Sequence, residues 1–291
     1  MAHAFDEDTA LEALPAFGRL AFTAGISHRW DTVGPPNGGF LLALAARGLA
    51  RAVPFPHPVT LTGHFLRPAR HTPVEIHVEP IRTGAGHATA MAAVHQGGKE
   101  ILRTLATFAD LNRPAFDGPP RPSPGDALRP PGGPTESGAR PPVLPPPEEC
   151  LPVEVLQPGQ WDDLPGAMPQ IYRSIDVRLV RPERREPGEI GRIEGWMRFS
   201  DGRDPDVAAL PLLADAFPPA VLAVADAAWV PTVELTVHVR GVPAPGWMAA
   251  SFRTRFLSDG YFEEDGELWD STGRLVALSR QLALTRGQRP A

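Results

Sequence analysis

The sequence predicts an α+β protein that consists of two similar units, each with one buried helix and a run of antiparallel strands. Apolar helical segments at residues 34–51 and 204–217 are each followed by four stretches in which apolar and polar residues alternate. Alternation with a period of two is typical of half-buried strands. The two units are separated by a segment in which 14 of the 36 prolines lie between Pro114 and Pro152.

In the first unit, residues 9–14 favour a short helix and residues 20–26 alternate as a strand. A turn rich in proline and glycine then leads into the apolar helix of residues 34–51. Because this helix carries mainly leucine and alanine, we expect it to be buried. The four strands that follow are predicted at residues 59–66, 74–81, 87–95 and 101–109.

The segment between the units has a proline content that is incompatible with a regular helix or a central strand. We therefore expect a linker that is partly polyproline II in character and contributes nothing to a core. The predicted boundaries are residues 1–112 for the first domain, 113–168 for the linker and 169–291 for the second domain.

In the second unit, strands are predicted at residues 175–179 and 193–199, before the helix at 204–217 that Asp204 and Pro205 would start. Four more strands are expected at residues 232–240, 247–257, 261–270 and 275–285. The order of elements repeats that of the first unit with an offset of 174 residues, which places His64 on His238. This offset also places Leu41 opposite Asp215 and Thr107 opposite Gln281. An internal duplication of this size predicts two similar domains packed together.

Composition limits the classes of function. The net charge of -6 and the isoelectric point near 5.9 argue against a nucleic-acid partner, which requires an excess of clustered Lys and Arg. The most apolar stretch, residues 208–230, contains two aspartates and three prolines, so we expect no membrane span. Cys150 is the single cysteine and no signal peptide is visible, and both observations predict a cytoplasmic protein.

Asp215 is the most unusual residue of the sequence, because it lies in the apolar run LPLLADAFPP of residues 210–219. A buried carboxylate requires hydrogen-bond partners, protonation or contact with a cavity. The alternative is an acid at a frayed helix end that contacts solvent. Residues Asn37, Gly38 and Gly39 begin the first helix, where free N–H groups favour an anion or a developing oxyanion. Small residues that merely allow close packing are the alternative there.

Common catalytic motifs are absent, including the nucleophile elbow, the phosphate loop and the His-Glu-x-x-His zinc motif. The nine histidines have spacings that predict no metal site. Thr232 begins the strand after the Asp215 segment, and Gln281 lies in the last strand, where a buried amide requires partners for both of its polar groups. Taken singly, each would be an ordinary strand residue.

Three segments of the second unit, ADAFPP at 214–219, PTVELTVHVR at 231–240 and DSTGRLVALSRQLAL at 270–284, resemble the type II acyl-CoA thioesterases. The segment PPNGGFLLALAARG at 35–48 is similar to the first helix start of that family. The resemblance covers residues 15–110 and 170–286 and implies a double hotdog, in which each curved antiparallel sheet surrounds a long central helix. It assigns the catalytic roles to Asp215, Thr232 and Gln281, which would orient the water that attacks the thioester.

The sequence departs from this family after Thr232, where Glu234-Leu235 replaces a common Asp-His pair, and at Pro211 inside the predicted helix. The resulting hypothesis is an acyl-CoA hydrolase that needs no metal or redox cofactor, with Asn37, Gly38 and Gly39 at the oxyanion. A homodimer of double hotdogs is a possible assembly. The alternatives are a hotdog hydratase or dehydratase, which normally requires an Asp and His pair, and an acyl-CoA-binding protein without turnover.

Overall fold

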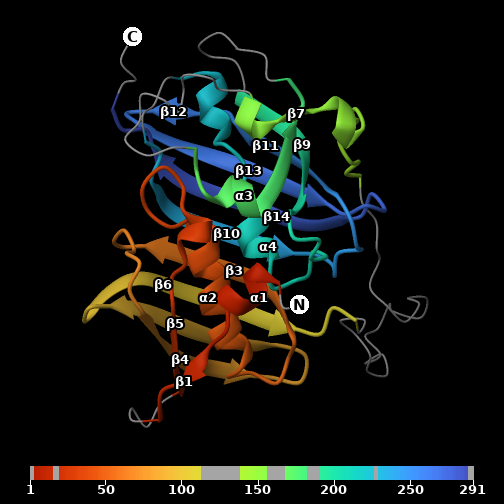
Figure 1. Cartoon of the computed structure of the whole chain (residues 1–291). Coiled ribbons are helices and arrows are strands. Elements are labelled where there is room, and N and C mark those ends of the chain that lie inside the picture. The colour runs from red at the N-terminus through yellow and green to blue at the C-terminus, as the bar shows by residue number, and fades with distance from the viewer. Residues whose placement is uncertain are drawn as a thin grey trace, which may run out of the picture.

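The computed structural model describes residues 3–15, 20–112, 138–155, 168–181, 191–225 and 229–287. Figure 1 shows two stacked halves, with the first half below and the second half above. The first half contains α1 (Ala4–Asp8), β1 (Glu12–Ala13), β2 (Leu20–Ala24), η2 (His28–Trp30), α2 (Gly38–Ala50), β3 (His57–Phe65), β4 (Val74–Thr83), β5 (Ala88–Gln96) and β6 (Lys99–Ala109). The second half contains η3 (Pro147–Glu149), β7 (Leu151–Pro152), η4 (Val153–Val155), α3 (Ile171–Ser174), β8 (Ile175–Leu179), β9 (Gly191–Phe199), α4 (Leu210–Leu213), η5 (Ala220–Ala223), β10 (Thr232–Val239), β11 (Met248–Thr254), β12 (Leu257–Ser258), β13 (Tyr261–Trp269) and β14 (Leu275–Leu284).

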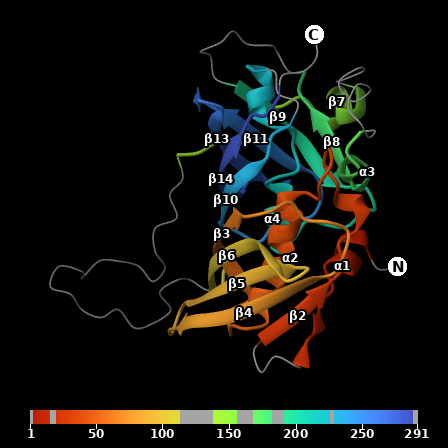
Figure 2. The ribbon, with the colours of Figure 1, turned by 90° about the vertical axis from the view of Figure 1, so that its left-hand side faces the viewer.

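The strands form one antiparallel sheet, in the order β1-β2-β4-β5-β6-β3-β10-β14-β13-β11-β9-β8-β7. The two halves meet where β3 pairs with β10 at the middle of this order. Figure 2 shows the same junction from the side, with β3 and β10 next to each other between the two halves. The predicted double hotdog is therefore confirmed, and each strand predicted by alternation has a counterpart in the sheet.

Helix α2 forms where the sequence predicts it. The Asn37 side chain caps it, because its Oδ1 accepts a hydrogen bond from the backbone N–H of Phe40 at 2.9 Å. Ten of its 13 residues are buried, so the helix lies inside the first half against β3, β4, β5 and β6. Gly48 brings the helix close to the sheet, because a Cβ at this position would lie 3.0 Å from a methyl carbon of Ile76.

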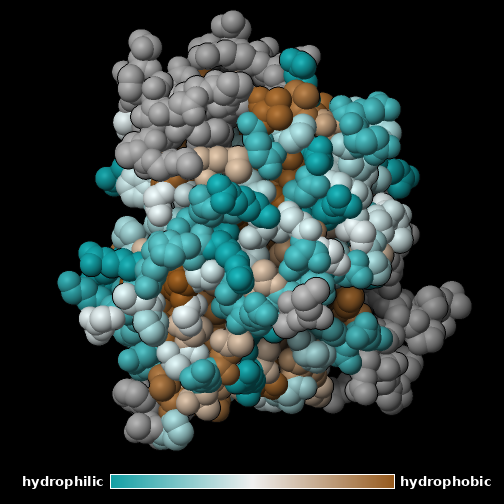
Figure 3. All heavy atoms as spheres, viewed as in Figure 1, coloured by the Kyte–Doolittle hydropathy of each residue, from teal (hydrophilic) through white to brown (hydrophobic). Residues whose placement is uncertain are grey.

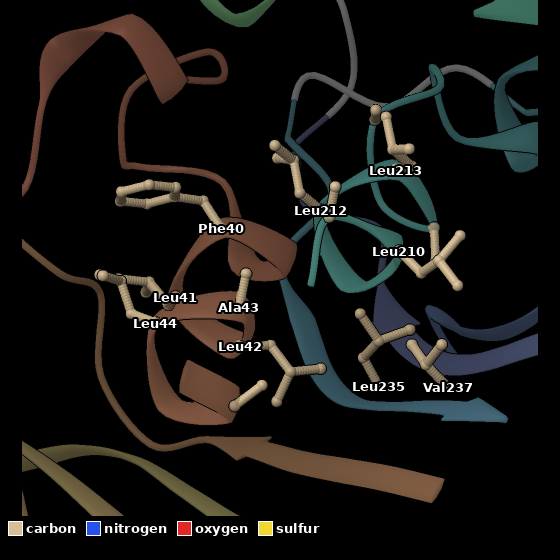
Figure 4. Packing of buried hydrophobic residues seen from close by; sticks show 14 of the residues in the cluster. Phe40, Leu41, Leu42, Ala43, Leu44, Leu210, Leu212, Leu213, Leu235 and Val237 are labelled. Atoms are coloured by element: carbon tan, nitrogen blue, oxygen red, sulfur yellow. The ribbon is translucent and has the colours of Figure 1, made fainter. Parts of the chain in front are cut away.

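The helix predicted at residues 204–217 is much shorter, so the expected long central helix occurs only in the first half. Only Leu210–Leu213 is helical, and Pro211 occupies the first turn of this short helix. Proline is tolerated there because the first N–H groups of a helix have no intrahelical acceptor. Pro218 and Pro219 follow closely and prevent extension at the other end. In Figure 4, Leu210 and Leu212 of α4 lie near α2 and above the strand that carries Leu235 and Val237.

Two local predictions are wrong. The N-terminal helix is Ala4–Asp8, whereas the predicted residues 9–14 contain the edge strand Glu12–Ala13, which pairs with β2. Part of the predicted linker also packs: Leu151 pairs with Leu179 of β8, and Val153 is buried. The apolar residues between the prolines thus extend the sheet at the edge of the second half. Residues 113–137 and 156–167 of the predicted linker lie outside the described residues.

On the molecular face in Figure 3, hydrophilic and hydrophobic residues are interspersed. Within the described ranges, no helix has the length and apolar character needed to cross a membrane.

Candidate active site

A cavity of about 430 Å³ lies where the two halves meet. The first half contributes the start of α2, and the second half contributes the segment after α4 together with β10, β13 and β14. Most of its lining is apolar, including Leu41, Phe65, Phe217, Leu222 and Leu284. The polar residues that line it include Asn37, Asp215, Thr232, Glu264, Gln281 and Tyr172.

Asp215 lies directly against the start of α2. Its Oδ2 accepts hydrogen bonds from the backbone N–H of Gly39 at 2.8 Å and from the Asn37 amide at 3.0 Å. The same Asn37 amide also donates to the backbone oxygen of Asp215 at 2.7 Å. The carboxylate therefore faces the positive end of a 13-residue helix that belongs to the other half of the chain.

Close packing of the two helices makes this contact possible. A Cβ on Gly39 would lie 2.3 Å from the backbone oxygen of Pro211 and 2.8 Å from Cβ of Asp215. Gly38 is also confined, because its Cβ would lie 3.2 Å from Oδ2 of Asp215. The two glycines thus allow close packing and place the start of the helix against the Asp215 carboxylate.

Burial raises the pKa of Asp215 to about 6, and this effect outweighs the hydrogen bonds from Gly39, Asn37 and Gly38, which lower the pKa. A carboxyl group with this pKa exchanges its proton close to neutral pH. Asp215 is therefore suited to accept a proton from water and to return it during a reaction.

Thr232, Gln281 and Glu264 form a hydrogen-bonded chain along the cavity wall. The Thr232 hydroxyl donates to Oε1 of Gln281 at 3.2 Å, and the Gln281 amide donates to Oε1 of Glu264 at 3.4 Å. The remaining carboxyl oxygen of Glu264 accepts the backbone N–H of Ala220 at 2.5 Å. Gln281, which is only 6% exposed, thus has partners for both of its polar groups.

Glu264 was not among the site residues predicted from the sequence. Burial raises its pKa to about 8, the Ala220 N–H lowers it, and the nearby Asp215 and Asp265 raise it further. The residue shares the inward face of β13 with Phe262 and Leu268, because these positions differ by an even number. An acidic residue in the inward register of a strand was the signal that could have identified it.

Tyr172 was also missed. It belongs to α3, is 6% exposed and lines the cavity, and its hydroxyl makes no hydrogen bond within the described parts of the chain. Burial and the nearby Asp215 raise its pKa, so the phenol is protonated at neutral pH. No sequence signal marks Tyr172, because only the docking of α3 brings it to the cavity.

The structure brings the six predicted site residues to one region. Asn37, Gly38, Asp215, Thr232 and Gln281 line the cavity, and Gly39 contacts Asp215 through its backbone N–H. One detail differs from the expectation: the Gly39 N–H is directed at Asp215 rather than left free for a substrate oxygen. No hydrogen bond within the described residues joins Asp215 directly to Thr232 or Gln281.

The corresponding position in the first half lacks these polar groups. Leu41 takes the place of Asp215 at the sequence offset of 174. The strand register corrects the predicted match of Thr107 with Gln281. Leu61 pairs with Ala106, whereas the counterpart of Leu61, Leu235, pairs with Gln281. Ala106, not Thr107, therefore corresponds to Gln281, because the ladders of the two halves differ by one residue.

Outside the cavity lining, His28, Asp31 and His71 come together, although the histidine spacings predicted no metal site. Nδ1 of His28 and Nε2 of His71 lie 3.0 and 2.7 Å from the two carboxyl oxygens of Asp31. The two imidazole rings are stacked, with centroids 3.5 Å apart. Each stacked ring directs one nitrogen at its own carboxyl oxygen of Asp31. A metal ion bound by both histidines would have to lie in the planes of both imidazole rings, which stacked rings do not allow. The arrangement is that of two histidines that share one carboxylate.

Several known proteins are similar to this chain. An uncharacterized protein of Mycobacterium tuberculosis is 28% identical, and the match covers 92% of this chain and 91% of that protein. A candidate thioesterase II of Thermobifida fusca has a crystal structure that matches with a TM-score of 0.80 and 28% identity, over 98% of both chains. An acyl-CoA thioesterase II of Mycobacterium marinum shares the fold, with a TM-score of 0.70, 22% identity and coverage of 98% of this chain and 99% of that one.

The fold also occurs in the dehydratase domain of RzxB from Pseudomonas fluorescens, with a TM-score of 0.59 and 11% identity, over 98% of this chain and 99% of that one. Two family models distinguish the thioesterases from this broader group. Residues 26–109 match the N-terminal domain of acyl-CoA thioesterases and residues 147–285 match the C-terminal domain. With both halves matched in order and joined across one cavity, the chain belongs to the acyl-CoA thioesterase family.

Proposed function

We propose that this protein hydrolyses acyl-CoA or a similar acyl thioester at the cavity between the two halves. The observation that carries the proposal is the buried Asp215 carboxylate, which has a pKa of about 6 and lies beside a mainly apolar cavity. A carboxyl group with this pKa is mostly ionised at neutral pH and is a stronger base than an ordinary carboxylate, which is favourable for general acid–base catalysis. An apolar wall suits the acyl chain.

In the proposed reaction, Asp215 removes a proton from a water molecule that Thr232 and Gln281 help to position. The water oxygen forms a bond to the thioester carbon, and the carbonyl oxygen takes up the negative charge. The C–S bond then breaks, the carbonyl re-forms, and the thiolate receives the proton held by Asp215. Asn37 and Gly38 with Gly39 hold the carboxylate in place, and the oxyanion role predicted for these residues remains a prediction.

Two arginines support a substrate that carries phosphate groups. Arg67 and Arg286 line the same cavity, and both side chains are exposed. Guanidinium groups bind phosphate oxygens in bidentate geometry. CoA combines phosphate groups with a thioester-linked acyl chain, so one end of the substrate would meet arginine and the other end would meet the apolar wall.

The alternatives make different predictions. A hotdog hydratase or dehydratase normally uses an Asp and His pair, and no histidine occurs among the described residues that line the cavity. An acyl-CoA-binding protein without turnover would retain the cavity and the arginines. In such a protein, the affinity for acyl-CoA would not depend on whether Asp215 is protonated.

The decisive experiment is thiol release from a panel of acyl-CoAs, from acetyl to palmitoyl and including aryl acids, with Asp215→Asn as the matched control. We expect release by the natural protein that falls about 10²-fold in the variant. Tight acyl-CoA binding without thiol release would identify the non-catalytic alternative. Hydration of an enoyl-CoA without hydrolysis would identify the hydratase.

A further inference from the structure

The hydrogen-bond donors near Asp215 are almost all engaged by protein groups. The Gly39 N–H and the Asn37 amide donate to Asp215, and the Thr232 hydroxyl donates to Gln281. The Gln281 amide in turn donates to Glu264. A thioester carbonyl that enters this site would therefore find each of these donor groups already bound to at least one other acceptor.

Tyr172 is different. Its side chain is buried and lines the cavity, and Asp215 is the charged group that acts most strongly on its phenol. The hydroxyl makes no hydrogen bond within the described residues, and its oxygen is not among their fully buried polar atoms that lack a partner, so it is open to the cavity. A donor that is open to the cavity and has no partner among the described residues is available to hydrogen-bond a ligand there.

The position of Tyr172 is fixed by both halves of the chain. The preceding residue, Ile171, donates its backbone N–H to the backbone oxygen of Asp31 at 3.1 Å. Ile171 itself is buried in the main core, and its neighbours in the sequence lead directly into β8. A donor on a fixed element requires little reorganisation when charge develops on a substrate.

We propose that the Tyr172 hydroxyl donates a hydrogen bond to the carbonyl oxygen of the thioester and stabilises the oxyanion. This inference rests on the proposed hydrolysis. When the water oxygen bonds to the thioester carbon, the carbonyl oxygen becomes negative and the phenol O–H bond is directed at it. Tyr172 keeps its proton throughout, and the oxyanion returns its electron pair to the carbon when the C–S bond breaks. The proton of the attacking water remains on Asp215 until the thiolate accepts it.

The first test is Tyr172→Phe, which removes only the hydroxyl. We expect kcat to fall about 10²- to 10³-fold, as for the loss of one oxyanion donor, with KM changed much less. The melting temperature should stay the same or rise, because the hydroxyl has no hydrogen-bond partner among the described residues. The matched control is Tyr261→Phe at the only other tyrosine, which is 50% exposed at the start of β13 and should leave kcat unchanged.

The second test detects the hydrogen bond without turnover. Asp215→Asn slows hydrolysis, so an acyl-CoA labelled with ¹³C at the thioester carbonyl can be observed in the bound state by infrared difference spectroscopy. A hydrogen bond from Tyr172 should lower the carbonyl stretching frequency relative to the free substrate. The double variant Asp215→Asn with Tyr172→Phe should lose this shift.

The outcomes separate the two levels of the proposal. A natural enzyme that hydrolyses thioesters, together with a Tyr172→Phe variant of equal kcat, would overturn the role of Tyr172 and leave the proposed function intact. An identical carbonyl frequency with and without the hydroxyl would do the same, as would a Tyr172→Phe protein that fails to fold. Absence of thiol release by the natural protein on the whole panel would overturn both.

Discussion

Thr62 of β3 and Thr236 of β10 face each other across the junction of the two halves, with their hydroxyl oxygens 2.8 Å apart. They are separated by 174 residues, which is the offset that relates the two halves in the sequence. On either side, Leu61 pairs with Val237 and Gly63 pairs with Leu235. At the offset of 174 residues, Val237 is the counterpart of Gly63 and Leu235 is the counterpart of Leu61. The residue before Thr62 therefore pairs with the counterpart of the residue after it, and the residue after Thr62 pairs with the counterpart of the residue before it. The pseudo-two-fold axis of the molecule therefore passes between the two threonines.

This symmetry predicts the number of working sites. A two-fold axis creates two equivalent positions, but the second position has Leu41 and Ala106 where the first has Asp215 and Gln281. We expect calorimetric titration with a non-hydrolysable acyl-CoA thioether to give one site per chain. Two sites of equal affinity would contradict this conclusion.

Asp215 should determine the acidic side of the pH profile. Its carboxylate must be ionised to act as a base, and its pKa is raised to about 6, so kcat/KM should fall as the pH decreases through 6. The same raised pKa makes the ionised form destabilising, since the unfolded chain ionises at lower pH than the folded one. Asp215→Asn should therefore abolish the acidic limb of the pH profile. It should also stabilise the protein relative to the natural chain, and this gain in stability should be larger at pH 8 than at pH 5.

The matched control for this variant is Asp259→Asn, in the exposed turn between β12 and β13. It should alter neither the pH profile nor the rate. An unchanged acidic limb in the Asp215→Asn enzyme would remove this residue from the reaction.

Glu264 should make the stability of the protein depend on pH between about 4.5 and 8. Its pKa is raised to about 8, mainly by burial, so the folded protein retains a proton that the unfolded chain has lost above its ordinary pKa of 4.5. Stability should therefore decrease as the pH rises from about 4.5 to 8, by at most about 1.4 kcal/mol for each pH unit. Glu264→Gln, which resembles the neutral acid, should flatten this dependence in urea unfolding at pH 5, 7 and 9.

Glu267→Gln, on the opposite face of the same strand, provides the comparison for Glu264→Gln. An equal slope of stability against pH in the natural protein and in Glu264→Gln would show that Glu264 is ionised at neutral pH in the folded state.

Gly39→Ala should damage both stability and activity. Its Cβ would lie 2.3 Å from the backbone oxygen of Pro211, so α4 and the Asp215 segment would have to move. Overpacking of this kind costs about 1–3 kcal/mol. The control is Gly25→Ala, where no atom lies within 4 Å of the added Cβ. Thermal unfolding and thiol release measured on both variants test the prediction, and a fully active Gly39→Ala enzyme would refute it.

The sequence alone was sufficient for the strands, for the first buried helix and for the duplication. Alternation predicted the strands because successive side chains of a strand point to opposite faces of the sheet, whichever strand lies next to it. The helix start at Asn37 was predictable because its cap involves only Phe40, three residues away. Asp215 stood out because a charge within an apolar run is unfavourable without partners.

Only the tertiary structure decided which groups meet. Gly39 and Asp215 are 176 residues apart, and their contact depends on the close approach of α2 and α4 across the axis. The same docking decides that the Gly39 N–H binds a carboxylate and that Tyr172 reaches the cavity from α3. The strand register made Ala106 the counterpart of Gln281 in the first half. Local sequence pattern specifies this register only to within one residue. These relationships arise from the packing of whole elements, and no short stretch of sequence contains the distances that packing creates.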